Sequence, residues 1–126
     1  MTISPLRLFA ALSLFLSTSA AAAVAVEDLA QLAPDADPQV LALALRARQC
    51  ALAHGDIAAD DRLAVIDYSR PSTQKRLWVF ELQPARLLYA EHVAHGRGTG
   101  ENLAQHFSNV DGSHQSSLGL FRTAET

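Results

Sequence analysis

The pattern of apolar and polar positions changes along the chain. Residues 1–26 are apolar at 18 of 26 positions and contain no acid. Over residues 38–54, leucines recur at near-helical spacing, which predicts a helix. From residue 63 the period shortens to two and β-branched and aromatic residues appear, which predicts strands over 63–68, 77–82 and 87–94.

The helical segment carries its own boundary signals. Asp37 is placed to accept the first free amide hydrogens as the N-cap, and Pro38 suits the first helical position because its missing N–H is not needed there. Gly55 can adopt the left-handed conformation that ends many helices. His54 falls in the last turn, so we expect it to interact with the helix end rather than to bind a ligand. A short helical turn is also expected over residues 27–33.

Short polar connections between the three strands predict an antiparallel meander. The stretch 69–75 is polar and contains a proline, and residues 83–86 form a four-residue reversal with Pro84 at a favoured turn position. The fold class expected is therefore mostly β with an N-terminal helix (α+β). The expected division is a helical segment over 26–62 and a β domain over 63–126.

The middle strand is apolar on both faces. Trp78, Phe80 and Leu82 share one side, and Leu77 and Val79 share the other, because successive side chains of a strand point in opposite directions. Both faces of the sheet need cover, and the helix is able to cover one.

The glycine-rich segment, residues 95–119, has little periodicity and holds five of the six glycines. Structureless connections of this length are uncommon in compact domains unless they line a site. The short polar groups of Ser108, Asn109, Ser116 and Ser117 are suited to hold a peptide backbone. We therefore predict that these four residues form the wall of a substrate groove.

The amino terminus is typical of a secretory signal. Arg7 gives a cationic start, residues 8–16 an apolar stretch, and residues 17–25 a small-residue run with Ala-x-Ala cleavage sites. We predict a signal peptide over 1–25, export to the periplasm or cell envelope, and membrane contact only through this signal. The alternative is an uncut membrane anchor, which the serines and the dependence on alanine disfavour.

Charge and cysteine content argue against several classes of function and of stabilising site. A net charge of −3 argues against nucleic-acid binding, which needs a basic face, and the single cysteine excludes an internal disulfide and any zinc site built from several thiolates. A site made from His92, His95, His106 and His114 remains an alternative, but we expect no metal and no cofactor. The run Gly96–Gly100 lacks the Gly-Lys-Ser/Thr of a phosphate-binding loop, so we expect a turn there.

The candidate groups for covalent or proton chemistry are few. Cys50 is the one possible thiolate, but it lies within the predicted helix beside Ala51 and away from a helix N-terminus, so we expect a buried, inert thiol. Asp67 and Tyr68 end the first strand, and we expect them to anchor the following turn.

The end of the sequence indicates an incomplete β domain. Residues 117–123 begin to alternate like a further strand, and no turn or capping residue follows them. Together with the two-sided apolar strand and a small core, this pattern leads us to expect that a C-terminal segment is missing.

Several separate motifs, in the right order over residues 38–126, resemble the first half of the murein L,D-transpeptidase catalytic-domain family, relatives of the YkuD-type enzymes. These motifs are Val65–Ser72, Arg76–Phe80, Val93–Gly98, Phe107–Asn109 and Ser116–Thr123. The resemblance implies a mostly-β domain, exported to the cell envelope, that acts on peptidoglycan stem peptides. It also implies a cysteine thiolate that forms an acyl-enzyme and passes the acyl group to an amine or water.

The sequence also departs from that family. The working cysteine and histidine of the family lie in later motifs of the His-Gly-Ala and Ser-x-Gly-Cys kind, and neither motif occurs in these 126 residues. We therefore assign no catalytic residue and expect the chain to be inactive alone. The competing interpretation is a non-catalytic envelope module that binds peptidoglycan or a partner protein.

Overall fold

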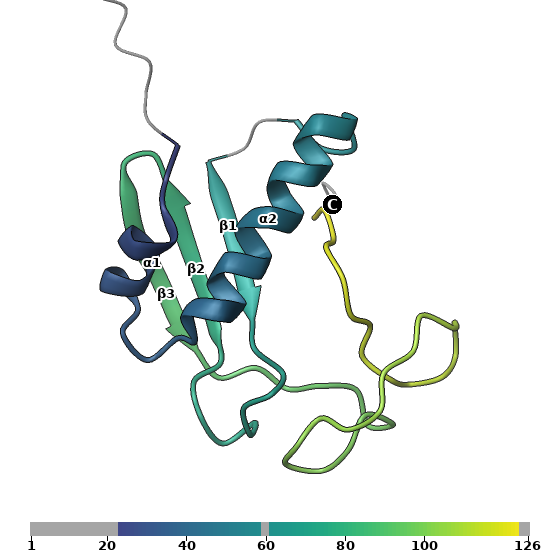
Figure 1. Cartoon of the computed structure of the whole chain (residues 1–126). Coiled ribbons are helices and arrows are strands. Elements are labelled where there is room, and N and C mark those ends of the chain that lie inside the picture. Colours follow the sequence, from purple (N-terminus) through teal and green to yellow (C-terminus); the bar gives the residue numbers. More distant parts are fainter. Residues whose placement is uncertain (1–22, 59–60, 124–126) are drawn as a thin grey trace, which may run out of the picture.

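In the part of the chain that the structure describes, two helices precede a three-stranded sheet, and a long irregular segment follows it (Figure 1). The computed structural model describes residues 23–58 and 61–123. The elements are α1 (Val26–Leu32), α2 (Pro38–His54), β1 (Arg62–Ile66), β2 (Leu77–Leu82) and β3 (Ala85–Glu91). Both strand pairs are antiparallel and the sheet order is β1-β2-β3, which confirms the predicted α+β class and the meander.

The predicted signal peptide over 1–25 lies outside the described residues except for its last three positions, so it stays a prediction. Within the described ranges, neither helix is long and apolar enough to cross a membrane.

Helix α2 begins and ends where its local signals place it. The Asp37 carboxylate accepts a hydrogen bond from the Gln39 N–H at 2.8 Å, and Gly55 follows the last turn with a φ of 76°. At the same end, the Nδ1 of His54 donates to the Cys50 carbonyl oxygen at 2.7 Å. The N-cap and the C-cap predicted from the sequence are both confirmed, and each satisfies backbone groups that a helix end leaves unpaired.

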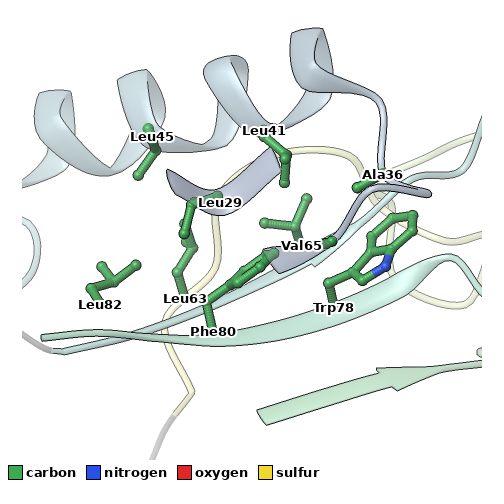
Figure 2. Close-up of a cluster of buried hydrophobic side chains, with 10 residues drawn as sticks. Leu29, Ala36, Leu41, Leu45, Leu63, Val65, Trp78, Phe80 and Leu82 are labelled. Carbon is green, nitrogen blue, oxygen red and sulfur yellow. The ribbon is translucent and has the colours of Figure 1, made fainter. Parts of the chain in front are cut away.

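The hydrophobic core lies between the helices and one face of the sheet (Figure 2). Leucines of α1 and α2 meet the inward side chains of β1 and β2, and each such large apolar side chain contributes about 1.5–3 kcal/mol when fully buried. The buried cluster includes Leu29, Leu41, Leu45, Leu63, Val65, Trp78, Phe80 and Leu82.

Among the described residues, no helix lies on the opposite face of the sheet, because α1 and α2 lie on the same side (Figure 1). Leu77 and Val79 are half-buried there, while Ile66 is 38% exposed and Tyr89 is 61% exposed. The expectation that the helices cover one face of the middle strand is confirmed.

The predicted bounds of the third strand were wrong by a few residues. The strand was expected over 87–94 after a four-residue reversal at 83–86, but β3 begins at Ala85. Ala85 and Arg86 pair with the end of β2, so only two residues form the turn. The pairing is favoured because the Arg86 guanidinium forms a salt bridge with its cross-strand partner Glu81. The first strand likewise spans Arg62–Ile66 rather than 63–68.

The strand expected over residues 117–123 is absent from the structure. In the described part, the chain after β3 makes one isolated parallel bridge, between Phe107 and Ser116, and residues 117–123 pair with neither edge strand. A strand needs a neighbour to satisfy its N–H and C=O groups, so alternating side chains alone do not produce one. The glycine-rich segment is irregular, as predicted.

Candidate functional site

The glycine-rich segment packs against the loop that joins β1 to β2, at one end of the sheet. The Ser72 N–H donates to the Asn102 carbonyl oxygen at 2.8 Å, and the Ser72 hydroxyl donates to the Asn102 side-chain oxygen at 3.1 Å. The rings of Tyr68 and Phe107 lie 5.7 Å apart. The β1–β2 loop and the glycine-rich segment, which are distant in sequence, therefore form one surface.

Asp67 fixes the start of the β1–β2 loop. Its carboxylate is buried, and Oδ1 accepts from the Ser69 N–H at 3.0 Å and from the Ser69 hydroxyl at 2.6 Å. Its own N–H donates to the Arg76 carbonyl oxygen at 2.8 Å, which closes the loop. The prediction that Asp67 anchors this turn is confirmed.

Arg76 is the buried charge around which this end of the molecule is built. Its side chain is 0% exposed, and its guanidinium donates to the Arg70 carbonyl at 2.9 Å and to the Val93 carbonyl at 2.8 and 3.1 Å. It also donates to His95 Nδ1 at 2.9 Å and lies 5.1 Å from the centre of the Tyr68 ring. No carboxylate is among these partners, so hydrogen bonds to carbonyl groups and the aromatic face offset the loss of hydration of the guanidinium.

Thr99 is the second centre of the network and is also fully buried. Its hydroxyl accepts from the Ser116 N–H at 2.7 Å, and its carbonyl accepts from the N–H groups of Gln105 and His106 at 2.8 and 3.0 Å. The Ser116 hydroxyl in turn accepts from the Gly96 N–H at 2.9 Å. The two ends of the glycine-rich segment are thereby held together.

Two glycines allow this close packing. A Cβ atom on Gly96 would collide with the carbonyl oxygen of His114, and one on Gly100, whose φ is 145°, would collide with the Leu103 carbonyl. Residues 97–99 form the expected turn. Gly96 and Gly100, which flank this turn, therefore permit close backbone contacts within the protein.

The structure brings the predicted groove residues together. Ser117 donates from its hydroxyl to the Ser108 carbonyl at 3.0 Å, and the Ser108 hydroxyl accepts from the Val110 N–H at 3.0 Å. With the contact of Ser116 described above, three serine hydroxyls stabilise the segment, and Asn109 is exposed. Each hydroxyl keeps further hydrogen-bonding capacity, and the predicted role of these residues as a groove wall stays a prediction.

An open cavity of about 350 Å³ lies beside Arg76's network. We call it the loop cavity. Its lining residues are Ser72, His92, Val93, Ala94, His95, Gly100 and Glu101. Because His95 belongs to both the cavity and the buried network, the shape of the cavity depends on Arg76.

Cys50 is exposed, so the prediction that it is buried was wrong. It lies nine residues after Leu41 and, at about 100° per residue, faces away from the core. The Sγ atom is 3.5 Å from His54 Nδ1, but that nitrogen donates its hydrogen to the Cys50 carbonyl oxygen. A nitrogen that carries hydrogen is no base for the thiol, so this pair lacks the activation that a cysteine nucleophile requires.

The histidines considered for a metal site do not converge. His92 Nε2 donates to the Thr73 carbonyl at 3.2 Å, His95 belongs to the Arg76 network, and His114 Nε2 accepts from Arg97 at 2.8 Å. In the part of the chain that the structure describes, no three His, Cys, Asp or Glu residues are grouped as a metal ion would require.

Sequence reasoning missed Arg76 and Thr99 as the centres of the site. Arg76 was visible as a charged residue directly before an apolar strand, and it opens one of the motifs that carry the family resemblance. Thr99 gave no comparable signal, because its importance comes from contacts with residues up to 17 positions away.

Comparison with known proteins identifies the family of this chain. The family model described as the L,D-transpeptidase catalytic domain matches residues 32–126, three quarters of the chain. No curated protein and no solved structure matches this chain. The matched range contains α2, the whole sheet, the Arg76 network and the glycine-rich segment. The resemblance found in the sequence is confirmed, and the chain belongs to the L,D-transpeptidase catalytic domain family.

Proposed function

We propose that this chain is the N-terminal scaffold of an exported L,D-transpeptidase-like protein that binds peptidoglycan stem peptides and is inactive by itself. The observation that carries the proposal is the family match over residues 32–126, which includes the glycine-rich segment and the loop cavity. The family resemblance implies acyl transfer from the carbonyl that precedes a terminal D-residue. The substrate expected is therefore a peptide that ends in a D-amino acid.

The chemistry expected of the complete catalytic domain is acyl transfer through a thiolate. The thiolate attacks the carbonyl carbon before the terminal D-residue, and hydrogen-bond donors stabilise the oxyanion that forms. Collapse of this intermediate expels the D-amino acid and leaves a thioester, which an amine or water then cleaves. Residues of the glycine-rich segment, with the exposed Asn109 beside half-buried serine hydroxyls that keep hydrogen-bonding capacity, are suited to bind the peptide.

The inactivity that we propose rests on the one thiol in the chain. Cys50 is exposed on α2, and the nearby His54 nitrogen is committed to a backbone carbonyl. The His-Gly-Ala and Ser-x-Gly-Cys motifs of the family do not occur in the sequence. The chain therefore lacks an activated nucleophile and its base.

Incubation of the purified chain with a disaccharide tetrapeptide tests this proposal. We expect neither release of D-alanine nor exchange of D-alanine for an added amine, and we expect Cys50→Ser to behave identically. Sedimentation with insoluble peptidoglycan should retain the chain, and substitution of Asn109 by Ala should reduce retention. Turnover that disappears in Cys50→Ser would contradict the proposed inactivity, and absence of retention would contradict the binding role.

A non-catalytic binding module is a second candidate, favoured by exposed apolar side chains near the serines. Leu118, Leu120 and Phe121 are 55%, 43% and 66% exposed on the extended chain after Ser117. Such side chains are suited to contact a partner protein. Phe121→Ser should weaken capture of a protein partner without changing peptidoglycan retention, and Val110→Ser, at a 72% exposed position, is the matched control.

Export to the periplasm or envelope is the part of the proposal that rests on residues 1–25. Expression of the whole chain in a Gram-negative host and fractionation of the cells test it. We expect the intact mass of the exported material to begin near Val24 or Val26, and full-length material confined to the cytoplasm would contradict export.

A further inference from the structure

The glycine-rich segment makes two arginine–histidine contacts, and in each the imidazole is the acceptor. Nη2 of Arg76 lies 2.9 Å from His95 Nδ1, and Nη2 of Arg97 lies 2.8 Å from His114 Nε2. A guanidinium donates hydrogen bonds, accepts none and keeps its proton in proteins. The contacted nitrogens therefore carry no hydrogen, and both histidines are neutral in this conformation.

A second contact fixes the tautomer of His95. Its Nε2 lies 3.0 Å from the Gly100 carbonyl oxygen, which can only accept, so Nε2 carries the hydrogen. Both ring nitrogens are thus committed, one to a donor and one to an acceptor. Protonation at Nδ1 would place an N–H against the N–H of Arg76 and would add a positive charge beside a guanidinium that is 0% exposed.

We propose that His95 is an acid-sensitive latch, whose protonation separates its ring from Arg76 and opens the glycine-rich segment. Histidine is the side chain that ordinarily changes charge between about pH 5 and 8. Opening would break the hydrogen bond between His95 and the Gly100 carbonyl. The adjacent turn would then be released, and with it the contact between Thr99 and Ser116. This latch does not depend on the proposed substrate.

The other charged groups around His95 define the necessary controls. Arg76 faces the ring from the position directly before β2, while His92 and Glu101 line the loop cavity together with His95. Arg97 and His114 are both exposed, so loss of their contact contributes less to the opening of the segment than loss of the contact between His95 and Arg76.

Amide hydrogen exchange of the whole chain, measured at about pH 7.5 and about pH 5, tests the latch. The amides to follow are Gly98, which donates to the His114 carbonyl, and Ser116, which donates to the Thr99 hydroxyl. After correction for intrinsic rates, we expect their protection to fall about tenfold in acid while β2 amides keep theirs. Unchanged protection at Gly98 and Ser116, or an equal loss in β2, would overturn the proposal.

The variant His95→Asn removes the titration and keeps an acceptor for Arg76, since Asn Oδ1 occupies nearly the place of Nδ1. The acid response should disappear in this variant and persist in His92→Asn, His114→Asn and Glu101→Gln. Persistence of the response in His95→Asn excludes the latch.

The imidazole ¹⁵N spectrum of the unmodified chain gives a second test that needs no variant. At about pH 7.5 we expect an unprotonated Nδ1 and a protonated Nε2 on His95. The opposite tautomer, or a doubly protonated ring in a chain whose Gly98 amide is still protected, overturns the proposal.

Discussion

The two ends of this small protein are stabilised in different ways. Where the helices cover the sheet, the contacts are apolar, and the side chains of Leu41 and Phe80 are 0% exposed. At the other end, Arg76 and Thr99 are also 0% exposed, but they are polar. The Arg76 guanidinium and the Thr99 hydroxyl hold the loops together through hydrogen bonds to backbone groups.

The comparison shows why the candidate site lies in the second region. Apolar packing is non-directional and holds whole elements together, whereas hydrogen bonds fix individual backbone groups in space. Arg70 connects the two regions, because its guanidinium lies 5.5 Å from the centre of the Trp78 ring and donates to the Asp35 carbonyl between the helices. Loss of packing should therefore affect the whole fold, and loss of a hydrogen bond should affect the loops first.

The largest effect is expected for Phe80→Ala, at the centre of the apolar region. The substitution removes a fully buried ring and leaves a cavity, which lowers the free energy of unfolding by about 3–5 kcal/mol. Urea unfolding followed by circular dichroism measures the change. Val110→Ala, at a 72% exposed position, is the control and should change stability by less than about 0.5 kcal/mol. Similar effects of the two substitutions would contradict the assigned core.

Arg76→Met should have the next largest effect, confined mainly to the loops. Methionine retains much of the volume but leaves the Arg70 and Val93 carbonyls without their donors, which costs about 2–3 kcal/mol. Hydrogen exchange of the glycine-rich segment measures the local destabilisation, and urea unfolding measures the change in the free energy of global unfolding. Arg97→Met, on an exposed side chain, is the matched control and should leave both nearly unchanged.

Thr99→Val should destabilise the glycine-rich segment by about 1–2 kcal/mol, because the Ser116 N–H loses its acceptor. The substitution keeps the shape of the side chain. Thr99→Ser restores the acceptor and should recover most of the loss. A valine variant with wild-type exchange at Ser116 would show that this hydrogen bond contributes little.

Asp37→Ala should have the smallest effect of the four, about 1 kcal/mol, because it removes the N-cap of α2. Thermal unfolding followed by circular dichroism checks it. Asp37→Asn retains an acceptor for the Gln39 N–H and should restore most of the stability. Equal losses in both variants would argue that the capping hydrogen bond is not the cause.

The parts of the fold that depend on neighbouring residues were predictable from the sequence. The bounds of α2 follow from an N-cap aspartate, a proline and a C-terminal glycine, all within a few positions of the helix ends. The sides of the middle strand follow from alternation. The exact ends of β3 were not predictable in this way, because they depend on pairing with β2 and on the Arg86–Glu81 salt bridge.

The candidate site was predictable only in outline. Composition located the glycine-rich segment and its serines, but Arg76 and Thr99 act through contacts between residues distant in sequence. The error over Cys50 has a different origin. The helix and its buried leucines were predicted correctly, but Cys50 was assigned to the buried side because it neighbours Ala51, and it lies on the side opposite Leu41.

Native-state hydrogen exchange of Arg76→Met tests most directly whether the two regions are stabilised separately. The account predicts that the Gly98 and Ser116 amides of this variant exchange at least about tenfold faster than in the unmodified chain, while amides of β2 keep their protection. An equal acceleration in β2 and in the glycine-rich segment would contradict it, since the guanidinium would then support the apolar core as much as the loops.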